Sequence, residues 1–259
     1  MTLRLNTPGI PQWIFWGGAR IVGLGVLLWQ LPARWLFSSV GAQTQCKVLI
    51  ESPAGSIWQG SAAVGFSEPS IDGKGCRPAL AVTERLHWNV SCQIFSPGCQ
   101  IAIQTPALIK PLRIDVKPGE IRIEDNEAQL PAEILEVLGA PWTLLHPRGQ
   151  LGARWNDLVF QDDNAAGNIR VSLNELISPI SQIQPLGSYD VQAELNKEGV
   201  NYTLNTSKGP LLLQAHGTLS RHSATGQGEA SATPEMKEAL TGLLNLIGKR
   251  QGDSYRLVF

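Results

Sequence analysis

The stretches Arg113–Lys117 (RIDVK) and Glu120–Asp125 (EIRIED) decide the fold class, because apolar and charged side chains alternate cleanly along both. Successive side chains of a β-strand point to opposite faces of the sheet, so this alternation predicts strands with one buried and one solvated face. Similar short runs, broken by Gly, Pro, Asn and Asp, continue from residue 43 onward. We therefore predict a mainly β body over residues 43–259, with antiparallel strands.

At least ten runs of this kind are present, which favours an extended, curved antiparallel sheet or one that folds over on itself. The other runs are CKVLIES (46–52), SIWQGSAAVGF (56–66), ERLHWNVSC (84–92), QIAIQT (100–105), GNIRVSL (167–173), YDVQAEL (189–195), NYTLNT (201–206), PLLLQAHGTL (210–219) and YRLVF (255–259).

Two segments predict helices that cover the apolar face of the sheet. Thr233-Pro234-Glu235 is typical of a helix start, with an N-cap oxygen, Pro at the first position and an acid in the first turn. Gly248 follows as a stop. The apolar stripe between them consists of Met236, Ala239, Leu240, Leu243, Leu244 and Ile247. A shorter helix is expected over 131–138. Each predicted helix follows a set of strands, which suggests two lobes, 43–140 and 141–259.

An apolar stretch, Trp13–Leu31 (WIFWGGARIVGLGVLLWQL), precedes the β body. At about 1.5 Å per residue its 19 residues just span a hydrocarbon core of about 30 Å. One interpretation is an uncleaved transmembrane anchor over 13–33, with residues 1–12 as a cytoplasmic tail. The other is a signal peptide cleaved after Ala42. A buried helix of a soluble protein fits less well, since the stretch holds four glycines and Arg20.

All four cysteines follow the apolar stretch, and an even number suits an exported, oxidised body. Cys92 and Cys99 flank a turn at Pro97-Gly98, which makes a disulfide between them plausible. Cys46 and Cys76 would then form a second pair. Four cysteines allow three connectivities, so the pairing stays open, and buried free thiols are the alternative.

Charge and motifs exclude several classes of function. Lys and Arg number 21 against 22 Asp and Glu, so the basic surface of a nucleic-acid binder is missing. The sequence holds no GxSxG, HExxH, Walker loop or strand-linked GxGxxG. We therefore expect no catalytic, cofactor or metal site, and a protein that binds or assembles. The candidate contact residues are Trp58 and the glycines beside it, Gly55 and Gly60, since a strand glycine often marks a close backbone approach.

Five short segments, spread in order over residues 31–250, carry a family resemblance. They are Leu31-Pro32-Ala33, Gly55-Ser56-Ile57-Trp58-Gln59-Gly60-Ser61-Ala62, Pro185-Leu186-Gly187-Ser188-Tyr189, Gly209-Pro210-Leu211-x-Leu213 with Gly217, and Leu240-x-x-Leu243-Leu244-Asn245-Leu246-Ile247-Gly248. Together they resemble the type II secretion system N proteins of Gram-negative bacteria. Arg20 and the four cysteines are departures from that pattern.

The resemblance implies a single-pass inner-membrane protein with its bulk in the periplasm and a fold like the AsmA-like long-strand proteins. It implies an accessory role in moving folded proteins across the outer membrane. The partners it implies are other inner-membrane and periplasmic components of the machine, together with inner-membrane lipid. The alternative function is a periplasmic carrier or binder of lipid or another hydrophobic ligand. A ligand-sized apolar concavity would favour the carrier, and an exposed apolar surface would favour assembly.

Overall fold

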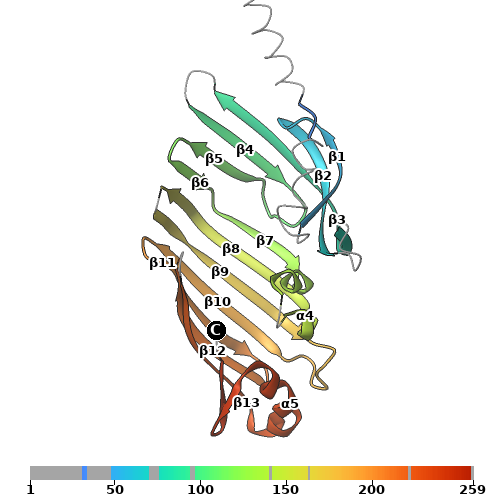
Figure 1. Cartoon of the computed structure of the whole chain (residues 1–259), viewed down its shortest axis with the longest axis vertical. Helices are drawn as coiled ribbons and strands as arrows, with labels where there is room; N and C mark the ends of the chain where they lie inside the picture. Colours follow the sequence, from blue (N-terminus) through green and yellow to red (C-terminus); the bar gives the residue numbers. More distant parts are fainter. Residues whose placement is uncertain are drawn as a thin grey trace, which may run out of the picture.

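The computed structural model describes residues 31–33, 48–69, 76–93, 97–139, 142–162, 164–220 and 223–257. Within these residues the chain is mainly β, and its strands form one antiparallel sheet. The expectation of a mainly β, antiparallel sheet is therefore confirmed. Figure 1 shows the strands following one another along the length of the molecule, with α4 and α5 towards the same end of the strands.

Nearly every strand pairs with its neighbour in sequence, in the order β1-β2-β3-β4-β5-β6-β8-β9-β10-β11-β12-β13-β15-β14. The bounds are β1 Val48–Gly55, β2 Gln59–Pro69, β3 Cys76–Gln93, β4 Gly98–Gln104, β5 Leu112–Lys117, β6 Glu120–Ile123, β7 Asn126–Pro131, β8 Arg148–Gln161, β9 Asn164–Ile177, β10 Gly187–Asn196, β11 Gly199–Lys208, β12 Leu211–Leu219, β13 Ala224–Ala232, β14 Lys249–Gln251 and β15 Ser254–Leu257.

One long strand, β8, links the N-terminal and C-terminal parts of the sheet. Two strands, β6 and β7, pair along the same edge of β8. Its residues 150–155 pair with β7, and its residues 158–161 pair with β6. β6 and β7 therefore follow one another along the same edge of β8, and residues 124–125 connect them. The division into lobes 43–140 and 141–259 stays a prediction.

The C-terminal helix forms where the apolar stripe predicts it. A short 3-10 turn, η2 (Pro234–Met236), leads into α5 (Lys237–Ile247), and Gly248 caps the end. Leu240, Leu243 and Leu244 are buried, whereas Met236 at the start of the stripe is 37% exposed. Thr233 makes no side-chain capping hydrogen bond, so that detail of the prediction was wrong.

The second expected helix is a 3-10 helix, η1 (Ala132–Leu138), followed by the short α4 (Trp142–Leu145). Gly139 ends η1 with φ of 87°, a conformation that glycine adopts without steric cost. Ala132 of η1 is fully buried in the same core as α5. Both expected helical segments therefore cover the sheet, although the first is not an α-helix.

The described residues hold two apolar cores of very different size. The larger core combines residues of β8–β13 and β15 with η1 and α5, including Leu173, Tyr189, Leu211, Leu240 and Leu244. The smaller one contains Ala33, Ala62 and Trp88. Between them, the strands with the clearest alternation, β5 and β6, have no fully buried side chain. The apolar face predicted there is only half-buried in the described structure.

No helix within the described ranges is long and apolar enough to cross a membrane. Of the expected anchor 13–33, only Leu31–Ala33 is described, so the anchor and the alternative cleavage after Ala42 lie outside the described residues.

The contribution of α5 to stability can be measured by truncating Leu244, which is 1% exposed. Leu244→Ala should lower the free energy of unfolding by about 2–5 kcal/mol, because it opens a cavity between helix and sheet. Leu246→Ala is the matched control, since Leu246 lies on the same helix and is 50% exposed. Its effect should stay within about 0.5 kcal/mol. Urea unfolding measures both, and equal losses in the two variants would contradict this account of α5.

Candidate functional site

The turn between β1 and β2 holds the three predicted contact residues, Gly55, Trp58 and Gly60. Gly55 ends β1 with φ of 89°, and a Cβ there would lie 2.8 Å from Cα of Gly60. Trp58 lies in the turn and is partly exposed, and its carbonyl accepts a hydrogen bond from the amide of Val90 at 2.6 Å. The two glycines thus allow a tight turn that presents Trp58 beside β3.

Gly60 is needed because a second tryptophan, Trp88 of β3, packs on it. A Cβ on Gly60 would lie 2.9 Å from Cε2 of Trp88 and nearer still to Cζ2 and to the carbonyl oxygen of Ala54. The Trp88 indole is 8% exposed and donates a hydrogen bond from Nε1 to the carbonyl of Ser56 at 3.1 Å. No sequence pattern indicated Trp88 as a site residue. Gly60 and Trp88 are cross-strand partners in the β2–β3 register, which the local sequence does not specify.

The segment Leu31–Ala33 docks on the same turn, which we call the N-terminal corner (residues 55–60 with Trp88). The amide of Ile57 donates to the carbonyl of Leu31 at 3.1 Å, and Pro32 forms an antiparallel bridge with Ser56. Ala33 is fully buried next to Trp88. Two motifs that are more than 20 residues apart in sequence therefore form one structural unit.

Cys92 and Cys99 form a disulfide, as the turn between them suggested. They face each other in the β3–β4 register, with a Cα–Cα distance of 4.0 Å. The side chains of Cys46 and Cys76 lie outside the described part of the structure, so their pairing stays a prediction.

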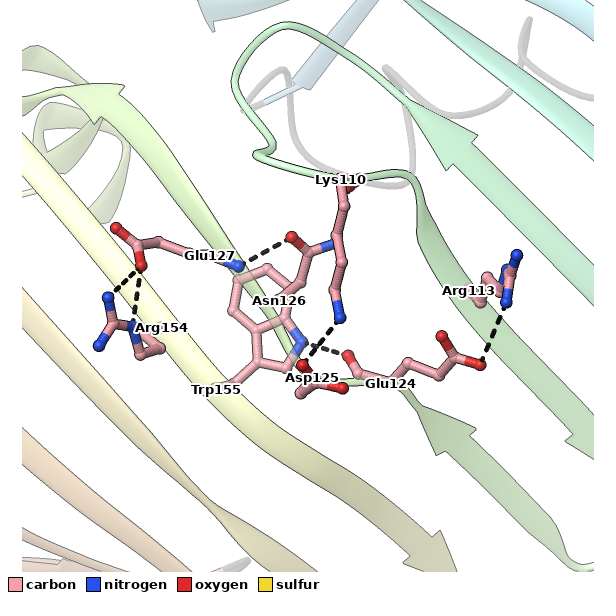
Figure 2. A network of polar contacts seen from close by, with 8 residues as sticks. All are labelled: Lys110, Arg113, Glu124, Asp125, Asn126, Glu127, Arg154 and Trp155. Atoms are coloured by element: carbon pink, nitrogen blue, oxygen red, sulfur yellow. Dashed lines mark hydrogen bonds and ion pairs between the residues drawn. The ribbon is translucent and has the colours of Figure 1, made fainter.

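A polar network surrounds the point where the chain passes from β6 to β7 (Figure 2). Asn126 is 4% exposed and donates from Nδ2 to the carbonyl of Lys110 at 2.9 Å, while its Oδ1 accepts from the amide of Glu127. The indole of Trp155 on β8 donates to the carbonyl of Glu124 at 2.9 Å. Both side chains thus hydrogen-bond to the backbone around the crossing from β6 to β7.

Ion pairs surround this crossing at the surface. Lys110 lies 2.8 Å from Asp125, and this hydrogen bond and charge hold the pKa of the Asp125 carboxyl below its ordinary value. Arg154 Nε donates to Glu127 at 2.8 Å. Exposed pairs of this kind contribute little to stability.

Two further segments of the family resemblance, 185–189 and 209–213, meet in the larger core. The amide of Leu211 donates to the carbonyl of Leu186 at 3.1 Å, and the Tyr189 hydroxyl donates to the carbonyl of Leu211 at 3.1 Å. A Cβ on Gly209, whose φ is 120°, would lie 2.9 Å from the carbonyl oxygen of Leu186. Tyr189 is 4% exposed, and burial raises its pKa. The segments 185–189 and 209–213 therefore form the floor of the larger core.

An apolar cavity of about 250 Å³ lies between this floor and the covering helices. Leu135 and Trp142 line it from the η1–α4 side, Leu243 and Ile247 from α5, and leucines and valines from the sheet. Such a cavity exceeds an ordinary packing defect.

Among the described residues, no three His, Cys, Asp or Glu side chains lie close enough together to hold a metal ion. The structure therefore offers two candidate sites, the N-terminal corner with Trp58 and the apolar cavity. Single-residue motifs could not indicate the cavity, because its lining comes from strands, η1, α4 and α5 together.

The corner geometry is tested by Gly60→Ala. The added methyl group collides with the Trp88 ring and with backbone, so the free energy of unfolding should fall by about 1–3 kcal/mol. Gly98→Ala is the matched strand control, because its Cβ would meet only ordinary contacts, the nearest 3.4 Å from the Val116 carbonyl oxygen. Thermal unfolding of both variants decides the matter. A Gly60→Ala protein as stable as the control would contradict the close Gly60–Trp88 contact.

The sequence comparisons agree with the motif resemblance. A family model described as type II secretion system (T2SS), protein N, matches residues 47–258, a range that includes all the described strands. Comparison with curated proteins and with solved structures found no match. The match spans more than half of the chain and confirms the resemblance based on the motifs. The chain belongs to the type II secretion system protein N family.

Proposed function

We propose that this chain is an accessory inner-membrane component of the type II secretion system, with its β body in the periplasm. The family match carries the proposal, since it makes the chain a component of this secretion machine and indicates a place in the cell envelope. The apolar stretch Trp13–Leu31 supports a membrane anchor. The disulfide between Cys92 and Cys99 supports an oxidising compartment such as the periplasm.

In this proposal the protein has no chemistry of its own and acts through contacts with other secretion components. The N-terminal corner is the proposed contact site, because Leu31–Ala33 holds it directly beside the end of the expected anchor. Partly exposed Trp58 would be its central contact, since tryptophan is enriched among residues that dominate binding energy.

A second observation supports a role in assembly. The sheet face at β6 and β8 exposes the cross-strand pair Ile121 and Phe160, which are 42% and 38% exposed. In this proposal the pair contributes to a surface that contacts another secretion component.

Deletion of the encoding region tests the proposed role directly. Secreted enzymes should accumulate in the periplasm and fall severalfold in the medium, and the intact gene should restore them. Unchanged secretion together with altered outer-membrane lipid would contradict the proposal and favour the carrier.

The corner contact is tested in the complemented strain with Trp58→Ala, which should lower the amount of secreted enzyme at an unchanged level of the protein. Leu219→Ala is the control, because Leu219 is 46% exposed but lies on β12, far along the sheet from the corner. Normal secretion with Trp58→Ala would exclude Trp58 as the contact and leave the secretion role to the deletion experiment.

A further inference from the structure

The apolar cavity under α5 has an elongated shape that follows from the strand register. Its lining includes Leu151 of β8, Val171 of β9, Val191 of β10, Leu204 of β11 and Leu213 of β12. Val171, Val191 and Leu204 are direct cross-strand neighbours, so they form one continuous row across the sheet. Five adjacent strands at about 4.8 Å spacing place the outermost of these lining strands about 19 Å apart.

The volume of the cavity is about 250 Å³. The lining side chains follow one row across the strands, and this arrangement suits a linear chain of methylene groups better than a folded peptide segment.

The lining also excludes a polar ligand, because no charged side chain or side-chain amide contributes to it. Its two hydroxyl groups already have partners within the protein. The Ser178 hydroxyl donates to the carbonyl of Leu145, and the Tyr189 hydroxyl donates to the carbonyl of Leu211. Because both hydroxyl protons are engaged and no charged side chain lines the cavity, an ionic headgroup of a ligand would find no counter-charge there and would stay outside.

We propose that this cavity binds a single unbranched acyl chain, with the polar headgroup of the lipid held outside it. This site goes beyond the proposed role in secretion and does not depend on it, since it rests on the cavity alone. The chain would lie across β8–β12 beneath α5, in contact with Val191 and Leu204.

Photocrosslinking on the full-length protein in membranes tests the proposal. The probe is palmitic acid with a diazirine in its chain and a terminal alkyne, supplied as the free acid or as the acyl chain of phosphatidylethanolamine. After irradiation, adducts should map to peptides that carry Val171, Val191, Leu204 or Leu213. Labelling from either source supports the site and identifies the lipid class. No adduct on these peptides from either source would overturn it.

Two neighbouring leucines of β12 supply a matched pair of variants. Leu213→Trp fills the cavity and should lower the adduct yield at least fivefold. Leu212→Trp lies on the opposite face, where Leu212 is 37% exposed, and should stay within twofold of wild type. Val191→Phe is a smaller cavity-filling change, in case Leu213→Trp fails to fold, as judged by circular dichroism and thermal unfolding. A folded cavity-filled variant that labels as strongly as wild type would overturn the proposal.

Discussion

The burial of one sheet face by α5 is the interaction on which the C-terminal half of the structure depends. Strands β8–β13 and β15 are paired in register, so their apolar rows lie side by side on one face. An open sheet cannot leave such a face in water. Leu240, Leu243 and Leu244 cover it, and η1 completes the cover through Ala132. The apolar cavity lies between the sheet and these covering segments.

The motifs of the family mark junctions of the fold. Leu31–Ala33 and residues 55–60 form one corner, in which Gly60 admits the Trp88 ring. Segments 185–189 and 209–213 form the other junction, where Gly209 lies against the Leu186 carbonyl. Glycine at these positions is required by backbone contact, whereas Trp58 is partly exposed, and in the function we propose it is the residue that contacts a partner.

The sequence predicted the strands whose side chains alternate and the helix with an apolar stripe. RIDVK and EIRIED lie on β5 and β6, and α5 occupies the predicted stripe. The sequence did not predict strands in which apolar and polar side chains alternate only weakly. β13 (ATGQGEASA) has too few large apolar residues to alternate, and β7 is recognisable only because it pairs with β8. The Trp88 site and the cavity depend on cross-strand register and helix placement, which local patterns do not encode. The disulfide between Cys92 and Cys99 could be predicted because only a short turn separates the two cysteines.

Hydrogen–deuterium exchange of the full-length protein, read peptide by peptide, tests most directly whether α5 and the sheet form one unit. Amides of α5 and of the central strands β9–β12 should exchange slowly and with similar opening free energies, because neither can open without exposing the shared core. The short exposed strand β14 should exchange quickly. Complete exchange of α5 within seconds, while β9–β12 stay protected, would contradict the account, since the sheet face would then persist without its cover.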